Sequence, residues 1–208
     1  MHGLINRAIQ CFLRDTYSPE FWERIMQTAD LGYTSFEAML VYEDQVTFDI
    51  LDLATQALDK ARPDLLEDLG TYLVSHDSVE ALRRLLRFGG VDFVDFLHSL
   101  DDLPDRARLA VPDLELPRLE LQQSHEAHYS LWCGGPAGFG SVMVGVLRAM
   151  ADDYGALVFL EHGGSREAKS TPGGPVPASE VGPEVVEITL LDVEFHEGRH
   201  FELAMKAG

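Results

Sequence analysis

The spacing of hydrophobic residues changes from a helical to an alternating pattern along this chain. In the first half, apolar side chains recur every three or four positions, which is typical of helices that bury one face. One helix start is well marked, because Ser18 and Pro19 are residue types preferred at an N-cap and at the first helical position. The expected helices cover residues 3–14, a segment from Pro19 to Ala29, residues 48–58, a short piece from Pro63, and residues 78–88, while residues 32–42 fit either a strand or a helix.

Residues 91–105 predict one further helix with a broad apolar face. Its apolar residues recur at three-residue spacing, with two phenylalanines beside them: Val94, Leu97, Leu100, Leu103, Phe93 and Phe96. Proline lacks a backbone N–H, so we expect this helix to end or kink near Leu103, just before Pro104. Beyond Asp105 the pattern becomes extended.

Strands dominate the expected second half. The expected elements are a strand through Leu119 and Leu121, a turn near Ser124, a partner strand over residues 127–133, a helix over 142–153, a strand over 156–160, a mobile loop over 163–183 rich in Gly, Pro and Ser, a strand over 185–195 and its hairpin neighbour over 200–205. Helices first and strands later, with one embedded helix, predict an α+β fold.

Charge and composition exclude several classes of function. A formal net charge of −19, from 35 acidic and 16 basic residues, leaves no positive footprint for nucleic acid or an anionic membrane. No run approaches the roughly 18 apolar residues of a membrane span, and the start of the chain lacks the pattern of a signal peptide. Cys11 and Cys133 form neither a disulfide framework nor a zinc spacing, so we expect a reducing, cytoplasmic setting.

The start of the chain resembles the haem–nitric oxide/oxygen-binding (H-NOX) family of gas sensors, found in bacteria and in soluble guanylate cyclase. The chain opens Met-His-Gly-Leu-Ile and continues to Leu13-Arg-Asp-Thr-Tyr17, similar to the family's N-terminal pattern, with Ser18 where that family usually has glycine. The resemblance covers roughly residues 1–160. It implies a helical N-terminal subdomain followed by an antiparallel sheet with an embedded helix.

This resemblance also implies a domain organisation. We expect a single H-NOX-like domain over residues 1–208, with an N-terminal helical subdomain over 1–62 and a C-terminal subdomain over 63–208.

A second matching segment departs from the family at the residue that holds the haem iron. The family's proximal helix has a pattern like Leu-Asp-x-Leu-His-Asp, and this chain reads Leu100-Asp-Asp-Leu-Pro104-Asp. By resemblance, Pro104 therefore stands at the position of the iron-ligating histidine, and its amide nitrogen has no lone pair to give to a metal. His98 is six residues earlier, roughly 9 Å along a straight helix and pointing elsewhere. A solvent-facing or capping role explains His98 better than iron ligation.

The family's grip on the haem propionates is changed as well. The resemblance places its Tyr-x-Ser-x-Arg clamp at His128, Ser130 and Trp132, so that histidine replaces tyrosine and tryptophan replaces arginine. No arginine occurs between Arg118 and Arg148, so a shifted alignment does not restore one. Tryptophan cannot form the bidentate pair that arginine forms with a carboxylate.

The apolar haem pocket of the family has counterparts in this chain. Residues at these positions are all apolar: Ile5, Ile9, Leu73, Pro117, Val142 and Val146. An ordinary hydrophobic core accounts for the same residues equally well.

Other motifs have simpler explanations than chemistry. His125 and His128 would point to opposite sides of one extended strand, and a third and fourth metal ligand are missing. Residues 134–140 are glycine-rich but lack the Lys-Ser/Thr of a phosphate-binding loop. Residues 101–105 fit an exposed acidic helix end, so we expect no metal site and no catalytic set.

Three functions are compatible with these observations. The first is a cytosolic H-NOX-like signalling module that lacks ordinary haem ligation and binds another apolar ligand or a protein. By family resemblance its partner would be a signalling enzyme such as a histidine kinase or a cyclic-dinucleotide enzyme. The second is a haem-based sensor of nitric oxide or oxygen that uses His98, His76 or His128. A metal-dependent or acid–base enzyme is the third and the least supported.

Overall fold

The helical first half of the chain forms as its hydrophobic pattern predicts. The computed structural model describes residues 1–165, 182–193, 195, 196 and 198. Ser18 caps the second helix by accepting a hydrogen bond from the Phe21 amide at 3.1 Å, and Pro19 lies in its first turn. The helices of this half are α1 (Gly3–Thr16), α2 (Pro19–Ala29), α3 (Asp44–Leu58), α4 (Arg62–Ser75) and, after a short 3-10 turn η1 (Asp77–Val79), α5 (Glu80–Arg87).

Two segments of this half differ from the expectation. The helix expected to be a short piece from Pro63 is α4, which is 14 residues long. The ambiguous stretch before α3 consists of turns, with one isolated antiparallel bridge between Val41 and His2. None of the described helices is long and apolar enough to cross a membrane.

The segment expected to be one helix over residues 91–105 is two short helices separated by a turn. The first is α6 (Phe93–His98), capped by Asp92, whose side chain accepts a hydrogen bond from the Asp95 amide at 2.8 Å. The second is α7 (Leu103–Ala110).

The expectation that a helix ends or kinks just before Pro104 is therefore wrong, and so is the extended conformation expected beyond Asp105. Pro104 lies in the first turn of α7, so it begins a helix instead of ending one. The physical reason is that the first N–H groups of a helix have no partner within it, so a residue without an N–H is tolerated there.

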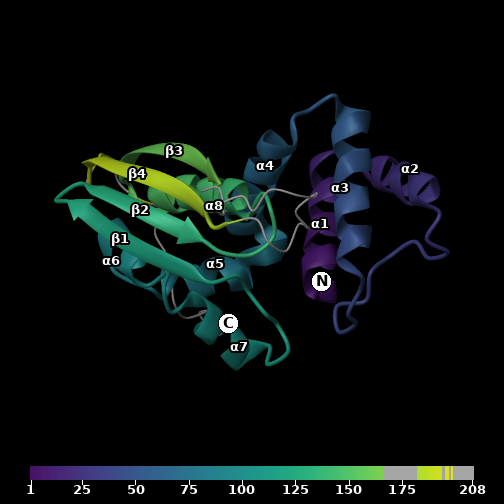
Figure 1. The fold of residues 1–208 in the computed structure, drawn as a ribbon, viewed down its shortest axis with the longest axis horizontal. Coiled ribbons are helices and arrows are strands. Elements are labelled where there is room, and N and C mark those ends of the chain that lie inside the picture. Colours follow the sequence, from purple (N-terminus) through teal and green to yellow (C-terminus); the bar gives the residue numbers. More distant parts are fainter. Residues whose placement is uncertain (166–181, 194, 197, 199–208) are drawn as a thin grey trace, which may run out of the picture.

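The second half forms a four-stranded antiparallel sheet in the order β1-β2-β4-β3, which confirms the predicted α+β class. Its elements are β1 (Leu119–His125), β2 (His128–Cys133), α8 (Phe139–Tyr154), β3 (Leu157–Ser165) and β4 (Glu184–Asp192). Figure 1 shows α8 along one face of the sheet and the helices α1–α3 grouped at the other end of the molecule. The expected loop over 163–183 begins inside β3, and its residues 166–181 lie outside the described part, as does the strand expected over 200–205.

Two hydrophobic cores meet at α4. The N-terminal core gathers side chains of α1, α2 and α3 with Leu65 and Leu69 of α4. The C-terminal core lies between α8 and the sheet and includes Val74 of α4 together with Leu97 and Leu100, which are 0% exposed. Because α4 contributes to both cores, it joins the helical half of the molecule to the sheet. The expected subdomain boundary at residue 62 stays a prediction.

The contact between α4 and α8 brings two backbones very close. A Cβ atom added at Gly70 would lie 2.0 Å from the carbonyl oxygen of Val142, and one added at Gly145 would lie 2.0 Å from that of Glu67. Only glycine allows such an approach. The joint between the two cores is therefore built from backbone contacts.

Candidate functional site

The residues around Pro104 are held by a guanidinium. Pro104 is buried at the start of α7, and Arg106 on the same helix donates hydrogen bonds to the carbonyl oxygens of Leu85 at 3.3 Å and Ser99 at 3.1 Å. Leu85 lies in the last turn of α5, and Ser99 is the C-cap of α6. Arg106 thus joins three helices by satisfying carbonyls that lack a partner in their own helix.

The residues expected to line the haem pocket are divided between the two cores. Ile9 is buried, and Ile5 and Leu73 are partly buried, in the N-terminal core; Val146 is buried in the C-terminal core, and Val142 packs against both. Pro117, just before β1, lies against Gly135, where an added Cβ would meet its side chain at 2.7 Å. Their role in a haem pocket stays a prediction.

The three residues at the propionate-clamp positions share one face of β2. His128, Ser130 and Trp132 alternate with Tyr129, Leu131 and Cys133, whose side chains belong to the C-terminal core. The clamp positions therefore face away from that core. Ser130 donates a hydrogen bond to Glu187 on β4 at 2.7 Å, so a propionate placed beside Ser130 would meet a second carboxylate, which repels it.

The histidines proposed as alternative iron ligands lie at the surface. His98 and His128 are exposed, and His76 is half-exposed and stacked on Tyr72 with ring centroids 4.6 Å apart. Among the residues that the structure describes, the only buried histidine is His2, whose Nδ1 accepts a hydrogen bond from the Leu4 amide at 3.2 Å. Consequently the described part of the C-terminal core contains no imidazole for a haem iron.

His125 and His128 do not lie on one strand, so the argument that they face opposite sides is wrong. They are cross-strand partners on either side of the β1–β2 turn, with ring centroids 6.2 Å apart. No group of three or more metal-ligating side chains occurs within the described ranges.

A cavity of about 320 Å³ lies where the helical half meets the start of α8. On the helical side, Arg62 pairs with Asp52 at 2.7 Å, and its guanidinium carbon lies 5.3 Å from the ring centre of Phe48. Pro63 and Leu66 of α4 add apolar surface. None of the residues predicted to surround a haem borders this cavity.

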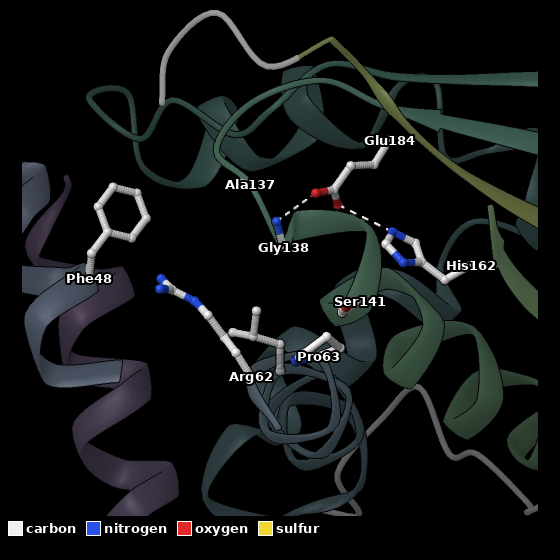
Figure 2. Close-up of a pocket in the computed structure, with 9 residues that line it drawn as sticks. Phe48, Arg62, Pro63, Ala137, Gly138, Ser141, His162 and Glu184 are labelled. Atoms are coloured by element: carbon white, nitrogen blue, oxygen red, sulfur yellow. Dashed lines mark hydrogen bonds and ion pairs between the residues drawn. The ribbon is translucent and has the colours of Figure 1, made fainter. Parts of the chain in front are cut away.

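The opposite wall of the cavity is organised by Glu184, which is 8% exposed. Its carboxylate accepts hydrogen bonds from the amides of Gly138 at 2.7 Å and Gly140 at 2.6 Å, and it lies 3.4 Å from Nε2 of His162. The N-cap residue of α8 provides no side-chain hydrogen bond. The Glu184 carboxylate from β4 instead accepts hydrogen bonds from amides at this helix start, and its negative charge interacts favourably with the helix dipole. Figure 2 shows this pair facing Arg62 across the cavity, with Ser141 on α8 between them.

Sequence reasoning missed this cavity. Glu184 begins β4, more than 40 residues beyond the Gly138 and Gly140 amides that it binds, and a cap of this kind has no local signature. The nearest local signal is the glycine-rich run before α8, which indicates an unusual helix start. In the structure, Gly138 of this run has a φ of +94°, a backbone conformation that favours glycine.

The arrangement of a helical half, a twisted antiparallel sheet and a helix embedded between its strands is that of the H-NOX fold. The chain is similar to a solved oxygen-binding H-NOX domain related to soluble guanylate cyclases (TM-score 0.71, 14% identity, covering 96% of this chain and 100% of that one). It is also similar to an Fe(II) unliganded H-NOX protein mutant from K. algicida (TM-score 0.75, 15% identity, 92% and 97% covered).

The family model for haem-NO-binding domains matches residues 2–162, and this chain therefore belongs to the haem-NO-binding (H-NOX) family. Among curated proteins, it is similar to soluble guanylate cyclase 89Db of Drosophila melanogaster (22% identity over 158 residues, 76% of this chain) and to soluble guanylate cyclase 89Da of the same organism (20% identity). The match spans only 24% of each cyclase's length.

Proposed function

We propose that this chain is an H-NOX sensor domain that signals without ordinary haem ligation, as a ligand-binding or protein-interaction module. The proposal is carried by Pro104, which by resemblance stands at the family's proximal position, is buried at the start of α7 and cannot coordinate iron. The altered clamp supports it, because Ser130 is bonded to Glu187 and the arginine position holds Trp132. The residues at these two positions, as the resemblance places them, do not supply the two attachments that a family haem needs.

The packing of α6 and α7 supports the same proposal. Leu97 and Leu100 are 0% exposed in a core that includes Leu147 of α8, so protein contacts cover these side chains. Arg106 fixes α7 to α5 and α6 by hydrogen bonds to backbone carbonyls. We infer that these protein contacts hold the α6–α7 segment in place.

By family resemblance, the output would pass to a signalling enzyme, such as a histidine kinase or a cyclic-dinucleotide enzyme. The relatives named above are cyclases of which the matched part is about a quarter, so the activity carried by the rest of those proteins is not assigned to this chain. A cytosolic setting remains our proposal from its two free cysteines.

Titration with haemin tests the proposal. We expect the purified chain to show no stoichiometric, saturable Soret band after reduction, while an oxygen-binding H-NOX domain treated in parallel shows one. One equivalent of haem bound with a histidine-ligated spectrum would overturn the proposal. In that case the variants His76→Ala, His98→Ala and His128→Ala would identify the ligand of the alternative, haem-based sensor.

A further inference from the structure

The cavity at the start of α8 is bordered by Arg62, whose guanidinium keeps a covered hydrogen-bond donor without a partner in the described part of the chain. Arg62 uses Nη1 to bind Asp52 at 2.7 Å, and its Nε is buried without a hydrogen-bond partner among the described residues. A buried N–H without an acceptor is unfavourable, so a ligand that supplies an acceptor after a small shift of the Arg62 side chain is favoured. The edge of a guanidinium that includes Nε is suited to receiving both oxygens of a carboxylate.

The rest of the cavity sets the size and polarity of such a ligand. Its volume of about 320 Å³ is at the lower end for small-molecule pockets. Phe48, Pro63, Leu66 and Ala137 provide apolar surface next to Arg62. The carboxylate of Glu184 is already bonded to two backbone amides, and Figure 2 shows it on the wall opposite Arg62. An anionic group is therefore favoured at the Arg62 side only.

We propose that this cavity is a binding site for a small aromatic or branched aliphatic monocarboxylate. The carboxylate binds Arg62, and the hydrocarbon part lies against Leu66 and Pro63. Because α3 and α4 form one wall and α8, β3 and β4 form the other, the bound molecule contacts both halves of the domain. Occupancy would thus bias how the halves are held together. The site is separate from the predicted haem positions, so it stands or falls independently of haem binding.

Benzoate serves as the probe, and benzyl alcohol as its uncharged analogue. In a titration followed by NMR, with the His162 ring resonances as a reporter inside the cavity, we expect saturable binding of benzoate with a Kd of about 1 mM, given its few atoms. Benzyl alcohol should bind at least about tenfold more weakly, since it cannot form the charged pair with Arg62. The ligand should also raise the Tm by about 2–4 °C at ten times Kd.

Three variants separate recognition by Arg62 from general anion binding. Arg62→Gln should weaken benzoate binding by about tenfold. Asp52→Asn removes the competing carboxylate and should tighten binding by about threefold. Arg148→Gln is the matched control, because Arg148 on α8 also pairs with a carboxylate, that of Glu67 at 3.1 Å, but lies outside the cavity. The affinity of this variant for benzoate should be unchanged.

Equal affinities for benzoate and benzyl alcohol would overturn the proposed carboxylate class. Absence of saturation at 20-fold the expected Kd, with His162 resonances unmoved, would overturn the site itself. Circular dichroism of Arg62→Gln confirms that a weakened response is not caused by unfolding. Haemin binding has its own spectral readout, so failure of the proposed function and failure of this site are told apart.

Discussion

The α4–α8 joint and the α5–α6–α7 segment both support the C-terminal core, but by different means. At the joint, Gly70 and Gly145 let the two helix backbones touch, because a Cβ atom added at either glycine would lie 2.0 Å from a carbonyl oxygen of the other helix. In the α5–α6–α7 segment, short helices are fastened by side chains: Arg106 bridges three of them, and Arg83 of α5 makes a two-pronged ion pair with Asp153 at the end of α8, at 2.5 and 2.9 Å.

This difference shows where the fold tolerates change. A backbone joint has no room for another side chain, so its residues are fixed by sterics. A segment held by side-chain hydrogen bonds can exchange residues as long as each helix end keeps a partner. The predicted departure from the family pattern at Pro104 falls in the second region, in the first turn of α7, where a residue without a backbone N–H is tolerated.

The largest expected effect comes from filling the joint. Gly145→Val should lower the free energy of unfolding by about 3 kcal/mol or more, because the new side chain overlaps the Glu67 carbonyl and α4 must move away from α8. Urea denaturation measures this loss. Gly134→Ala is the control, since its Cβ would meet the Arg118 carbonyl oxygen at 3.3 Å, which a shift of a few tenths of an ångström relieves, and it should lower stability much less. A tolerated valine at position 145 would show that the joint is not tightly packed.

Removing the guanidinium that holds α7 should have an intermediate effect. Arg106→Ala is expected to cost about 1–3 kcal/mol, because the carbonyls of Leu85 and Ser99 lose their donor. Hydrogen exchange should increase first in α7. Arg108→Ala on the same helix removes only an exposed pair with Asp105, worth about 0.3–0.5 kcal/mol. If the two variants are equally stable, Arg106 does not fasten the segment.

The smallest effect is a difference in thiol reactivity between the two cores. Burial in the C-terminal core, with the charge of Glu184 nearby, raises the pKa of Cys133 to about 12. Iodoacetamide at pH 8 should therefore modify the partly exposed Cys11 well before Cys133, which reacts only when its core opens. Mass spectrometry of native and guanidinium-unfolded samples gives both rates. Similar rates for the native protein would indicate that the C-terminal core opens as readily as the N-terminal one.

Much of the fold follows from local patterns. The first helices, the Ser18 cap, the β1–β2 hairpin and α8 all have their signals within a few residues of themselves. The division of residues 91–105 into two helices cannot be read from the apolar spacing, because that spacing continues through the break. The C-cap of α6 at Ser99 and the first-turn place of Pro104 in α7 mark it instead.

The sequence by itself determined the family and the α+β class, since both depend on residue identity and short-range spacing, and it predicts that Pro104 stands at the position of the iron-ligating histidine. Only the tertiary structure decided that the clamp positions face away from the C-terminal core, that Arg106 joins three helices and that a cavity opens between Arg62 and Glu184. Such features depend on which residues meet after the chain has packed. Arg62 and Glu184 are far apart along the chain, and no local period encodes their meeting.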